Sequence, residues 1–208
     1  MPDEPAPDAT LRERILHAAF SLFMERGYAG TSTLAIATRA RVSKRDIYAL
    51  FADKRAILAV GIAERVQRML IALELPPARN RKALARTLRV HGVAMLRGLS
   101  DPTVTAVFRL AIAESGRSHE VAEALETGGR QRHQQALTDL LVAARGSGLL
   151  RGADPEVMTR HFYGLLIGNL QMRLLLRAAE PPTEAEIEAR TDAAVEAMLV
   201  LYGKHRTD

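Results

Sequence analysis

Hydrophobic residues recur along this chain at helical spacing. Between residues 11 and 26, Ile15, Ala18, Leu22 and neighbouring apolar residues fall on one face, and Gly27 follows the last turn. Strand signals are nearly absent, because Asn-Gly turns, Asp-Gly turns and sustained alternation are missing. The sequence therefore predicts an all-α protein of about nine helices. They are expected at about 11–26, 31–39, 44–51, 54–73, 80–99, 102–115, 118–145, 155–178 and 183–203.

Local capping signals mark several helix starts. A threonine followed three residues later by a glutamate forms a capping box at 10–13 and again at 183–186. An aspartate precedes a proline at 101–102 and at 154–155, which places the proline at the first helical position. Prolines at 76–77 interrupt the helical pattern. These marks predict a compact N-terminal unit that ends within the fourth helix.

Composition narrows the class of protein. The 208 residues are 48% hydrophobic, which is enough for a sizeable core. They include no cysteine, which excludes disulfides, thiolate zinc sites and cysteine nucleophiles. The N-terminal MPDEPAPDAT is acidic and rich in proline, unlike a signal peptide, and the longest apolar runs are too short to span a bilayer. We expect a cytoplasmic protein with no membrane partner, and residues 1–9 as a disordered or extended tail.

Charge is unevenly distributed along the chain. The net charge is +2 over residues 1–60, +6 over 61–97 and −3 over 98–208. Basic charge in the first half is expected of a segment that meets a polyanion such as double-stranded DNA. The densest group is Arg79, Arg81, Lys82, Arg86 and Arg89. Such a cluster usually forms a solvated helix face. Alternatively, it binds an acidic effector or partner, or it adds to the positive potential that faces DNA.

The helices predicted at 31–39 and 44–51 are joined by four residues, the length of a tight turn. Small alanines allow the two helices to approach, and Ile36 and Val42 can fill the space between them. This is the spacing of a helix-turn-helix, whose second helix enters the DNA major groove.

The second of these helices has two faces. Ile47, Leu50 and Phe51 share an apolar arc, which we expect to pack on the domain. The neighbouring arc is left for DNA, where lysine suits phosphate, arginine suits guanine and tyrosine can form a hydrogen bond. Lys44 could instead be a solvated surface residue, and Tyr48 could instead pack and form a hydrogen bond within its own domain. The candidate DNA contacts, with helix starts and nearby cations included, are Thr31, Ser32, Arg39, Arg41, Ser43, Lys44, Arg45, Tyr48 and Lys54.

Asp46 allows two interpretations. Its carboxylate can close a capping box with Ser43, three residues earlier, or it can accept a hydrogen bond from cytosine in DNA. The spacing favours the capping box.

Four motifs in the first 58 residues resemble the TetR family of bacterial transcriptional repressors. They are R-I-L-x-A-A-x-x-L-F at 14–23, G-Y-x-x-T-S at 27–32, I-A-x-x-A-x-V-S-K at 36–44 and I-Y-x-x-F-x-x-K-x-x-x-L at 47–58. Arg41 departs from the family pattern, which usually has glycine in this turn. Arginine in a left-handed conformation costs about 1 kcal/mol relative to glycine, although its side chain can add a phosphate contact.

The resemblance implies a two-part protein. Residues 10–55 would form a helix-turn-helix DNA-binding domain, and residues 56–208 an effector-binding and dimerisation domain. The second part is similar to the AefR-type C-terminal domain through F-R-L-x-x-x-E at 108–114. In related proteins the last two long helices, here at about 155–178 and 183–203, pair with their counterparts in a homodimer. The implied function is a repressor that binds a pseudo-palindromic operator, is released by an unknown small-molecule effector and needs no cofactor.

An effector pocket would lie inside the helical bundle of the second part. Methionines and aromatic residues at helical spacing usually belong to the plain core. His91 and Asn169 are more suggestive, because a buried polar side chain needs a partner. The candidates expected to face inward are Met69, His91, Met95, Phe108, His133, Phe162, Tyr163, Asn169 and Met172.

Two other classes of function compete with a regulator. A helical enzyme is disfavoured, because the six histidines are scattered and neither a His-Glu-x-x-His pair nor a phosphate-binding loop occurs. An architectural DNA binder without sequence preference would not need a large second half with a negative net charge. We therefore expect a regulator rather than an enzyme.

Overall fold

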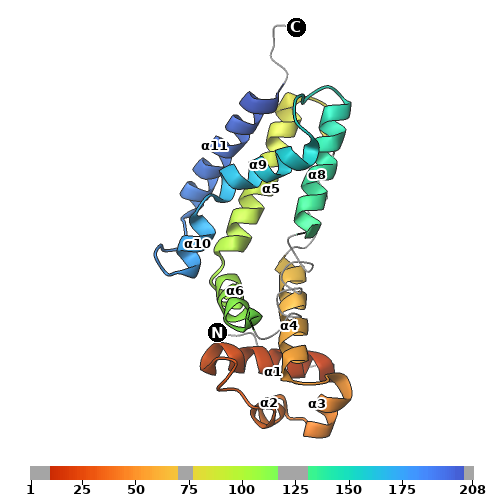
Figure 1. Ribbon diagram of the computed structural model, residues 1–208, viewed down its shortest axis with the longest axis vertical. Coiled ribbons are helices and arrows are strands. Elements are labelled where there is room, and N and C mark those ends of the chain that lie inside the picture. The colour runs from red at the N-terminus through yellow and green to blue at the C-terminus, as the bar shows by residue number, and fades with distance from the viewer. Residues whose placement is uncertain (1–9, 70–76, 117–130, 204–208) are drawn as a thin grey trace. The chain divides into compact units, whose positions relative to one another are not determined.

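The computed structural model describes residues 10–69, 77–116 and 131–203, and every regular element within them is a helix (Figure 1). Two compact units divide these residues, and residues 106–116 belong with the N-terminal helices in the first unit. Within the described residues, no helix is both long and apolar enough to cross a membrane. The helices are α1 (Leu11–Arg26), α2 (Thr33–Ala40), α3 (Lys44–Leu50), α4 (Lys54–Met69), α5 (Arg81–Ser100), α6 (Pro102–Ser115), α8 (Gln131–Gly146), α9 (Pro155–Ile167), α10 (Leu170–Leu175) and α11 (Glu184–Tyr202).

In the first unit, α1 packs against α2 and α4, and α2 packs against α3. The face of α1 that its spacing predicts is buried. Ile36 of α2, Ile47 of α3 and Ile57 of α4 are also almost completely inaccessible to solvent. Thr10 begins α1 through the predicted capping box with Glu13. The helices α2, α3 and α4 therefore share a core with α1, and each contributes an isoleucine.

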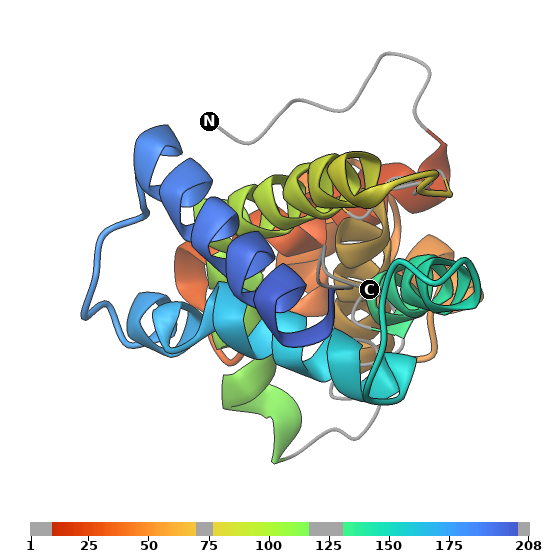
Figure 2. The same cartoon turned by 90° about the horizontal axis from the view of Figure 1, so that it is seen from above.

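In the second unit, α11 packs along α5 and α9, and α8 packs against α9 (Figure 2). One apolar cluster joins these helices, with Leu88 from α5, Leu141 from α8, Phe162 from α9 and Met198 from α11 fully buried in it. Full burial of such a side chain contributes about 2 kcal/mol. This cluster is therefore a main source of the stability of the second unit.

Two predicted helices differ from the structure. The described part of the helix expected at 118–145 is α8, and residues 117–130 lie outside the described residues. The helix expected at 155–178 is interrupted, because Gly168 adopts φ +50° after α9 and α10 begins only at Leu170.

Arg190 of α11 stabilises this interruption. Its Nε donates to the carbonyl oxygen of Leu166 at 2.6 Å, and its Nη2 donates to that of Ile167 at 3.0 Å. A Cβ atom on Gly168 would lie 2.9 Å from Arg190 Nη2. The last carbonyl groups of α9 are thus satisfied by a side chain from another helix, and glycine leaves room for that side chain.

Candidate nucleic-acid interface and buried polar cluster

A capping box fixes the start of α3. The Ser43 backbone N–H and the Ser43 hydroxyl donate to Asp46 Oδ2 at 2.8 and 2.7 Å, and the Asp46 N–H donates to Ser43 Oγ at 3.1 Å. The Ser43 hydroxyl, followed by the Ser43 N–H, lowers the pKa of the Asp46 carboxyl. The capping interpretation of Asp46 is therefore confirmed.

One face of α3 attaches it to the first unit. Ile47 is fully buried, and Phe51, just past the helix, enters the core with an extended backbone (φ −139°, ψ 131°). The apolar arc predicts that Leu50 joins them, but Leu50 is 44% exposed. This prediction is wrong because α3 ends at Leu50, and the extended conformation turns the chain inward only at the next residue.

The other face of α3 carries three exposed side chains, which we call the α3 edge: Lys44, Arg45 and Tyr48. The Tyr48 ring is 55% exposed, and its hydroxyl lies 3.5 Å from Thr33 Oγ1 of α2. The α3 edge therefore presents two cations and a phenol to solvent from a helix whose opposite face is fixed.

The turn between α2 and α3 has a left-handed residue. Arg41 adopts φ 55° and ψ 50°, as expected where the TetR pattern has glycine, and its side chain is exposed. The Nη2 atom of Arg14 on α1 donates to the carbonyl oxygens of Ala40 at 2.7 Å and of Arg41 at 2.9 Å. The first helix thus holds the turn that positions α3.

Thr31 and Lys54 support the loop before α2. Thr31 is almost fully buried, and its hydroxyl lies within donating distance of the carbonyl oxygens of Leu22 (3.1 Å) and Gly27 (2.8 Å). Thr31 is predicted as a helix start that holds phosphate, but its N–H donates to the carbonyl oxygen of Tyr28 at 3.2 Å, and α2 begins only at Thr33. Lys54 is half-buried, and its Nζ donates to the carbonyl oxygens of Tyr28 and Thr31, both at 2.7 Å. Lys54 also lies 4.0 Å from the centre of the Tyr28 ring, so it anchors this loop to α4.

Arg39 and Ser32 also have partners in the first unit. Arg39 Nη1 donates to Glu25 Oε1 at 2.5 Å and to Ser21 Oγ at 3.1 Å, and the hydrogen bond from Arg39 lowers the pKa of the Glu25 carboxyl. Ser32 Oγ accepts the Ala35 N–H at 3.1 Å and caps α2. The predicted DNA contacts that are exposed are Ser32, Arg39, Arg41, Ser43, Lys44, Arg45 and Tyr48.

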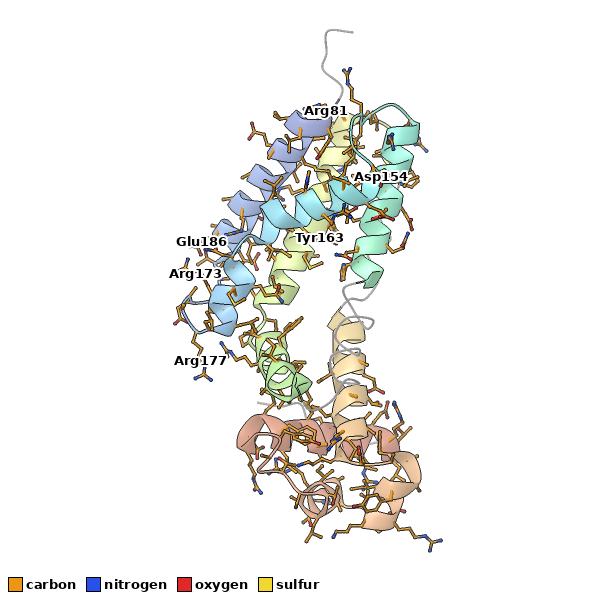
Figure 3. The ribbon with its side chains drawn as sticks, viewed as in Figure 1. Arg81, Asp154, Tyr163, Arg173, Arg177 and Glu186 are labelled. Atoms are coloured by element: carbon orange, nitrogen blue, oxygen red, sulfur yellow. The ribbon has the colours of Figure 1, made fainter. Side chains whose placement is uncertain are left out.

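The second unit holds a buried cluster of rings from three helices. His91 of α5 is 0% exposed, and its Nε2 lies 2.8 Å from the hydroxyl of Tyr163, which Figure 3 labels on α9. His133 of α8 is 7% exposed, and the centres of the two imidazole rings are 5.7 Å apart. The ring of Phe162 is centred 6.2 Å from that of His91. The structure thus brings together four of the predicted effector residues.

Burial controls the protonation of this cluster. Burial, with a smaller effect of His133, lowers the pKa of His91 from 6.5 to about 4. Burial also lowers the pKa of His133 and raises the pKa of Tyr163. These three side chains are therefore neutral near pH 7. Among the described residues, His91 Nδ1 and His133 Nε2 have no hydrogen-bond partner.

The other predicted effector residues lie elsewhere. Met95 is half-buried against the core of the second unit, and Phe108 lies in α6, in the first unit. Asn169 and Met172 are exposed, which corrects the expectation that they face inward. The break after α9 ends the helical face that would have placed them in the core. The side chain of Met69 lies outside the described residues.

A groove of about 540 Å³ lies beside the loop between α10 and α11. Arg173, Glu186 and Arg190 line it together with apolar residues such as Ile187, and Figure 3 labels the first two. The prolines at 181–182, which also line the groove, mark the loop in the sequence but do not predict a groove. Arg190 lines this groove and also donates to the last carbonyl groups of α9. No pattern of neighbouring residues in the sequence predicts either contact.

Arg89, which belongs to the basic group, and Arg97 further along α5 both pair with acidic residues of α11. Arg89 pairs with Asp192 at 2.7 Å and with Glu188 at 3.3 Å, and Arg97 pairs with Glu184 at 2.6 Å. All five side chains are substantially exposed, so solvent screens these pairs. Part of the basic group is therefore used within the second unit. The acidic residues recur every four positions along α11, which is a signal that the sequence does contain.

Two known protein families match the chain, one in its N-terminal part and one in its C-terminal part. Residues 15–60 match the family described as bacterial regulatory proteins, tetR family. Residues 86–204, more than half of the chain, match the AefR-like transcriptional repressor, C-terminal domain. No curated protein matches the chain.

Several solved structures are similar over nearly the full length of the chain. A TetR transcriptional regulator from Agrobacterium tumefaciens is 30% identical, with a TM-score of 0.82, and the match covers 95% of this chain and 96% of that one. The flavonoid-responsive regulator FrrA is 28% identical, with a TM-score of 0.79 and coverage of 94% and 98%. A TetR-family transcriptional regulator from Mesorhizobium loti MAFF303099 is 25% identical, with a TM-score of 0.76 and coverage of 96% and 100%.

Proposed function

Because this chain belongs to the TetR family of bacterial transcriptional regulators, with an AefR-like C-terminal domain, we propose that it is a repressor. In this proposal a homodimer binds a pseudo-palindromic DNA operator through its two N-terminal units. A small-molecule effector binds the C-terminal unit and favours a conformation with lower operator affinity. The effector can shift the equilibrium between the two conformations by no more than the difference in its binding free energy for them.

The α3 edge carries the DNA-binding part of the proposal. Its side chains project from a helix whose other face is fixed by Ile47, which is how a recognition helix enters the major groove. In this role Lys44 binds phosphate, and Arg45 offers its guanidinium group to guanine O6 and N7. Tyr48 donates its hydroxyl to a phosphate or a base edge. Arg41 adds an exposed cation in the preceding turn.

Exposed apolar and small residues on α9 and α11 support a homodimer. Val200 and Leu201 are each 59% exposed, and Leu165 is 42% exposed. Gly164 and Ala193 are exposed as well, and their small size allows a helix of a second subunit to approach closely. A two-fold dimer uses the same face on both subunits. It also brings two recognition helices to half-sites about one helical turn, or a multiple of it, apart.

The similarity to FrrA supports a response to an organic molecule. FrrA, which is 28% identical over nearly the whole chain, is described as flavonoid-responsive. The buried rings of His91 and His133 and the half-buried ring of Tyr163 provide the C-terminal unit with polar groups that could hold such a molecule.

Alanine substitutions in the α3 edge test the proposal. The operator is first selected from random DNA with the wild-type protein. Lys44→Ala and Tyr48→Ala should each weaken operator binding roughly 10- to 100-fold, because each removes a direct contact. The melting temperature and the mass in solution should stay nearly unchanged, because both side chains are exposed. Arg145→Ala, which removes an exposed cation from α8 in the second unit, serves as the control and should bind as the wild type does.

Two results would contradict the proposal. Wild-type footprints from both α3-edge variants would mean that this edge does not bind DNA. If bulk DNA competes as well as the selected operator at a fixed salt concentration, the protein binds DNA without sequence preference, because non-specific affinity is dominated by counterion release.

A further inference from the structure

The buried rings of the second unit leave two polar atoms unsatisfied. The Tyr163 hydroxyl and His91 Nε2 form one hydrogen bond of 2.8 Å. His91 Nδ1, on the other side of the same ring, and His133 Nε2 have no partner among the described residues, although both rings are more than nine-tenths buried. Buried polar groups are almost always paired, so these two atoms call for a group that the protein does not supply.

A neutral imidazole has one donor nitrogen and one acceptor nitrogen. The hydrogen bond with Tyr163 occupies Nε2 of His91, and the opposite role is left to Nδ1. The His133 ring lies 5.7 Å from the His91 ring, centre to centre, which is close enough for a single small group to contact both imidazoles. A hydroxyl group suits this place, because it can donate to one nitrogen and accept from the other.

The surroundings favour a molecule without charge. Burial is the main cause that lowers the pKa of both imidazoles, which indicates surroundings of low polarity. The nearby Phe162 ring is fully buried. A carboxylate or an ammonium group would be buried here beside imidazoles that are neutral near pH 7, which is unfavourable. An aromatic ring, in contrast, would find other rings to pack against.

From these contacts we propose that the effector of this regulator is an uncharged aromatic molecule whose hydroxyl group bridges His91 Nδ1 and His133 Nε2. This inference rests on the proposed function, in which an effector binds the C-terminal unit, and it specifies the chemistry of that effector. Tyr163 is a positioning residue, because it fixes the ring of His91 through Nε2.

Three matched probes test the inference on the full chain without DNA. p-Cresol carries the hydroxyl, p-xylene replaces the hydroxyl with a methyl group, and p-toluate replaces it with a carboxylate. Histidine-ring NMR spectra near pH 7.5 should show shifts of the His91 and His133 signals with p-cresol. We expect p-cresol to bind at least roughly tenfold more tightly than either other probe, since one good hydrogen-bonded group is worth about that factor.

Two variants identify the atoms involved. His133→Leu should remove the preference for p-cresol over p-xylene, because the second bridging nitrogen is lost. His17→Gln, which changes a histidine of α1 in the first unit, should keep that preference. If His133→Leu does not fold, the ring signals of the wild-type protein still decide the question.

Several outcomes would overturn the inference. They are equal responses to p-cresol and p-xylene, no response to p-cresol up to its solubility limit, or a preference for p-cresol that survives in His133→Leu. A nitrogen–nitrogen coupling between the two imidazoles that persists with saturating p-cresol would show that the rings pair with each other instead. All of these measurements are made without DNA. A protein that fails to bind an operator would contradict the proposed function, but the probe-binding measurements could still be interpreted.

Discussion

Arg41 occupies the turn between α2 and α3 with a left-handed backbone, at φ 55°. This conformation costs a residue other than glycine about 1–2 kcal/mol. The guanidinium group of Arg14 binds the carbonyl oxygens of Ala40 and Arg41, which holds the turn in place from α1. The turn therefore tolerates backbone strain while it keeps an exposed cation beside the start of α3.

Two substitutions of Arg41 separate the strain from the side chain. Arg41→Gly should raise the free energy of unfolding by about 0.5–1 kcal/mol, because relief of the strain exceeds the extra entropy that glycine loses on folding. Arg41→Ala keeps the strain and should give no such gain. Urea unfolding measures this difference, and equal stabilities of the two variants would show that the turn is not strained. Both variants lack the cation, so both should reduce the salt dependence of operator binding by a slope of about 1.

The structural role of a residue could be predicted from the sequence where that role depends on residues a few positions away. The capping roles of Thr10, Ser43 and Thr183 follow from a side chain three residues away, and all three are present in the structure. Thr31 and Leu50 could not be predicted in the same way. The burial of Thr31 depends on carbonyl groups of α1 and the following loop, and the exposure of Leu50 depends on where the α3 helix ends.

At the scale of helices, α5 and α11 meet closely at one glycine. A Cβ atom on Gly92 would lie 2.7 Å from Thr191 Cγ2 and 3.3 Å from Leu166 Cδ1. Thr191 is fully buried, and its hydroxyl donates to the carbonyl oxygen of Ile187 at 2.8 Å, so it has little freedom to move. Gly98, two turns further along α5, has no atom within 4 Å of an added Cβ.

These two glycines form a matched pair for mutation. Gly92→Ala should lower the free energy of unfolding by about 1 kcal/mol, because overpacking of about 1–3 kcal/mol exceeds the gain in helix propensity. Gly98→Ala should raise it by about 0.5 kcal/mol, because only the propensity gain applies there. Adding Thr191→Ser to Gly92→Ala removes the clashing methyl group, keeps the hydroxyl and should restore stability. Denaturant unfolding measures all three, and a stabilised Gly92→Ala protein would contradict the close approach.

The existence of most helices could be predicted from hydrophobic spacing, but one interruption could not. The helix expected at 155–178 contains apolar residues on both sides of the break. Its interruption depends on Gly168 and on hydrogen bonds from Arg190, which lies more than twenty residues further along the chain. The buried ring cluster has a similar origin. His91 and His133 are single histidines on separate helices, and only the packing of α5, α8 and α9 brings them together.

For the whole molecule, operator affinity should depend on the proposed dimer, because the dimer places two N-terminal units on one operator. Ala193→Arg introduces a large charged side chain on the exposed face of α11 and should convert the dimer into monomers. Operator affinity should then fall by on the order of 100-fold or more, because one half-site is bound at a time instead of two. Light scattering measures the mass, and a DNA titration measures the affinity. Ala143→Arg, on an exposed position of α8, is the control. A dimeric Ala193→Arg protein would exclude this face of α11 from the interface.

The two buried imidazoles also contribute to the response of the C-terminal unit to acid. Above pH 6.5, His91 is uncharged in both the folded and the unfolded chain, so its contribution to stability is complete. Between pH 6.5 and 4, His91 is protonated in the unfolded chain but stays neutral in the folded chain. The free energy of unfolding is therefore lower by about 3 kcal/mol at pH 4 than above pH 6.5. His133 acts in the same direction. Mild acidification should therefore loosen the C-terminal unit, and His91→Phe should flatten that loss when unfolding is followed across this pH range.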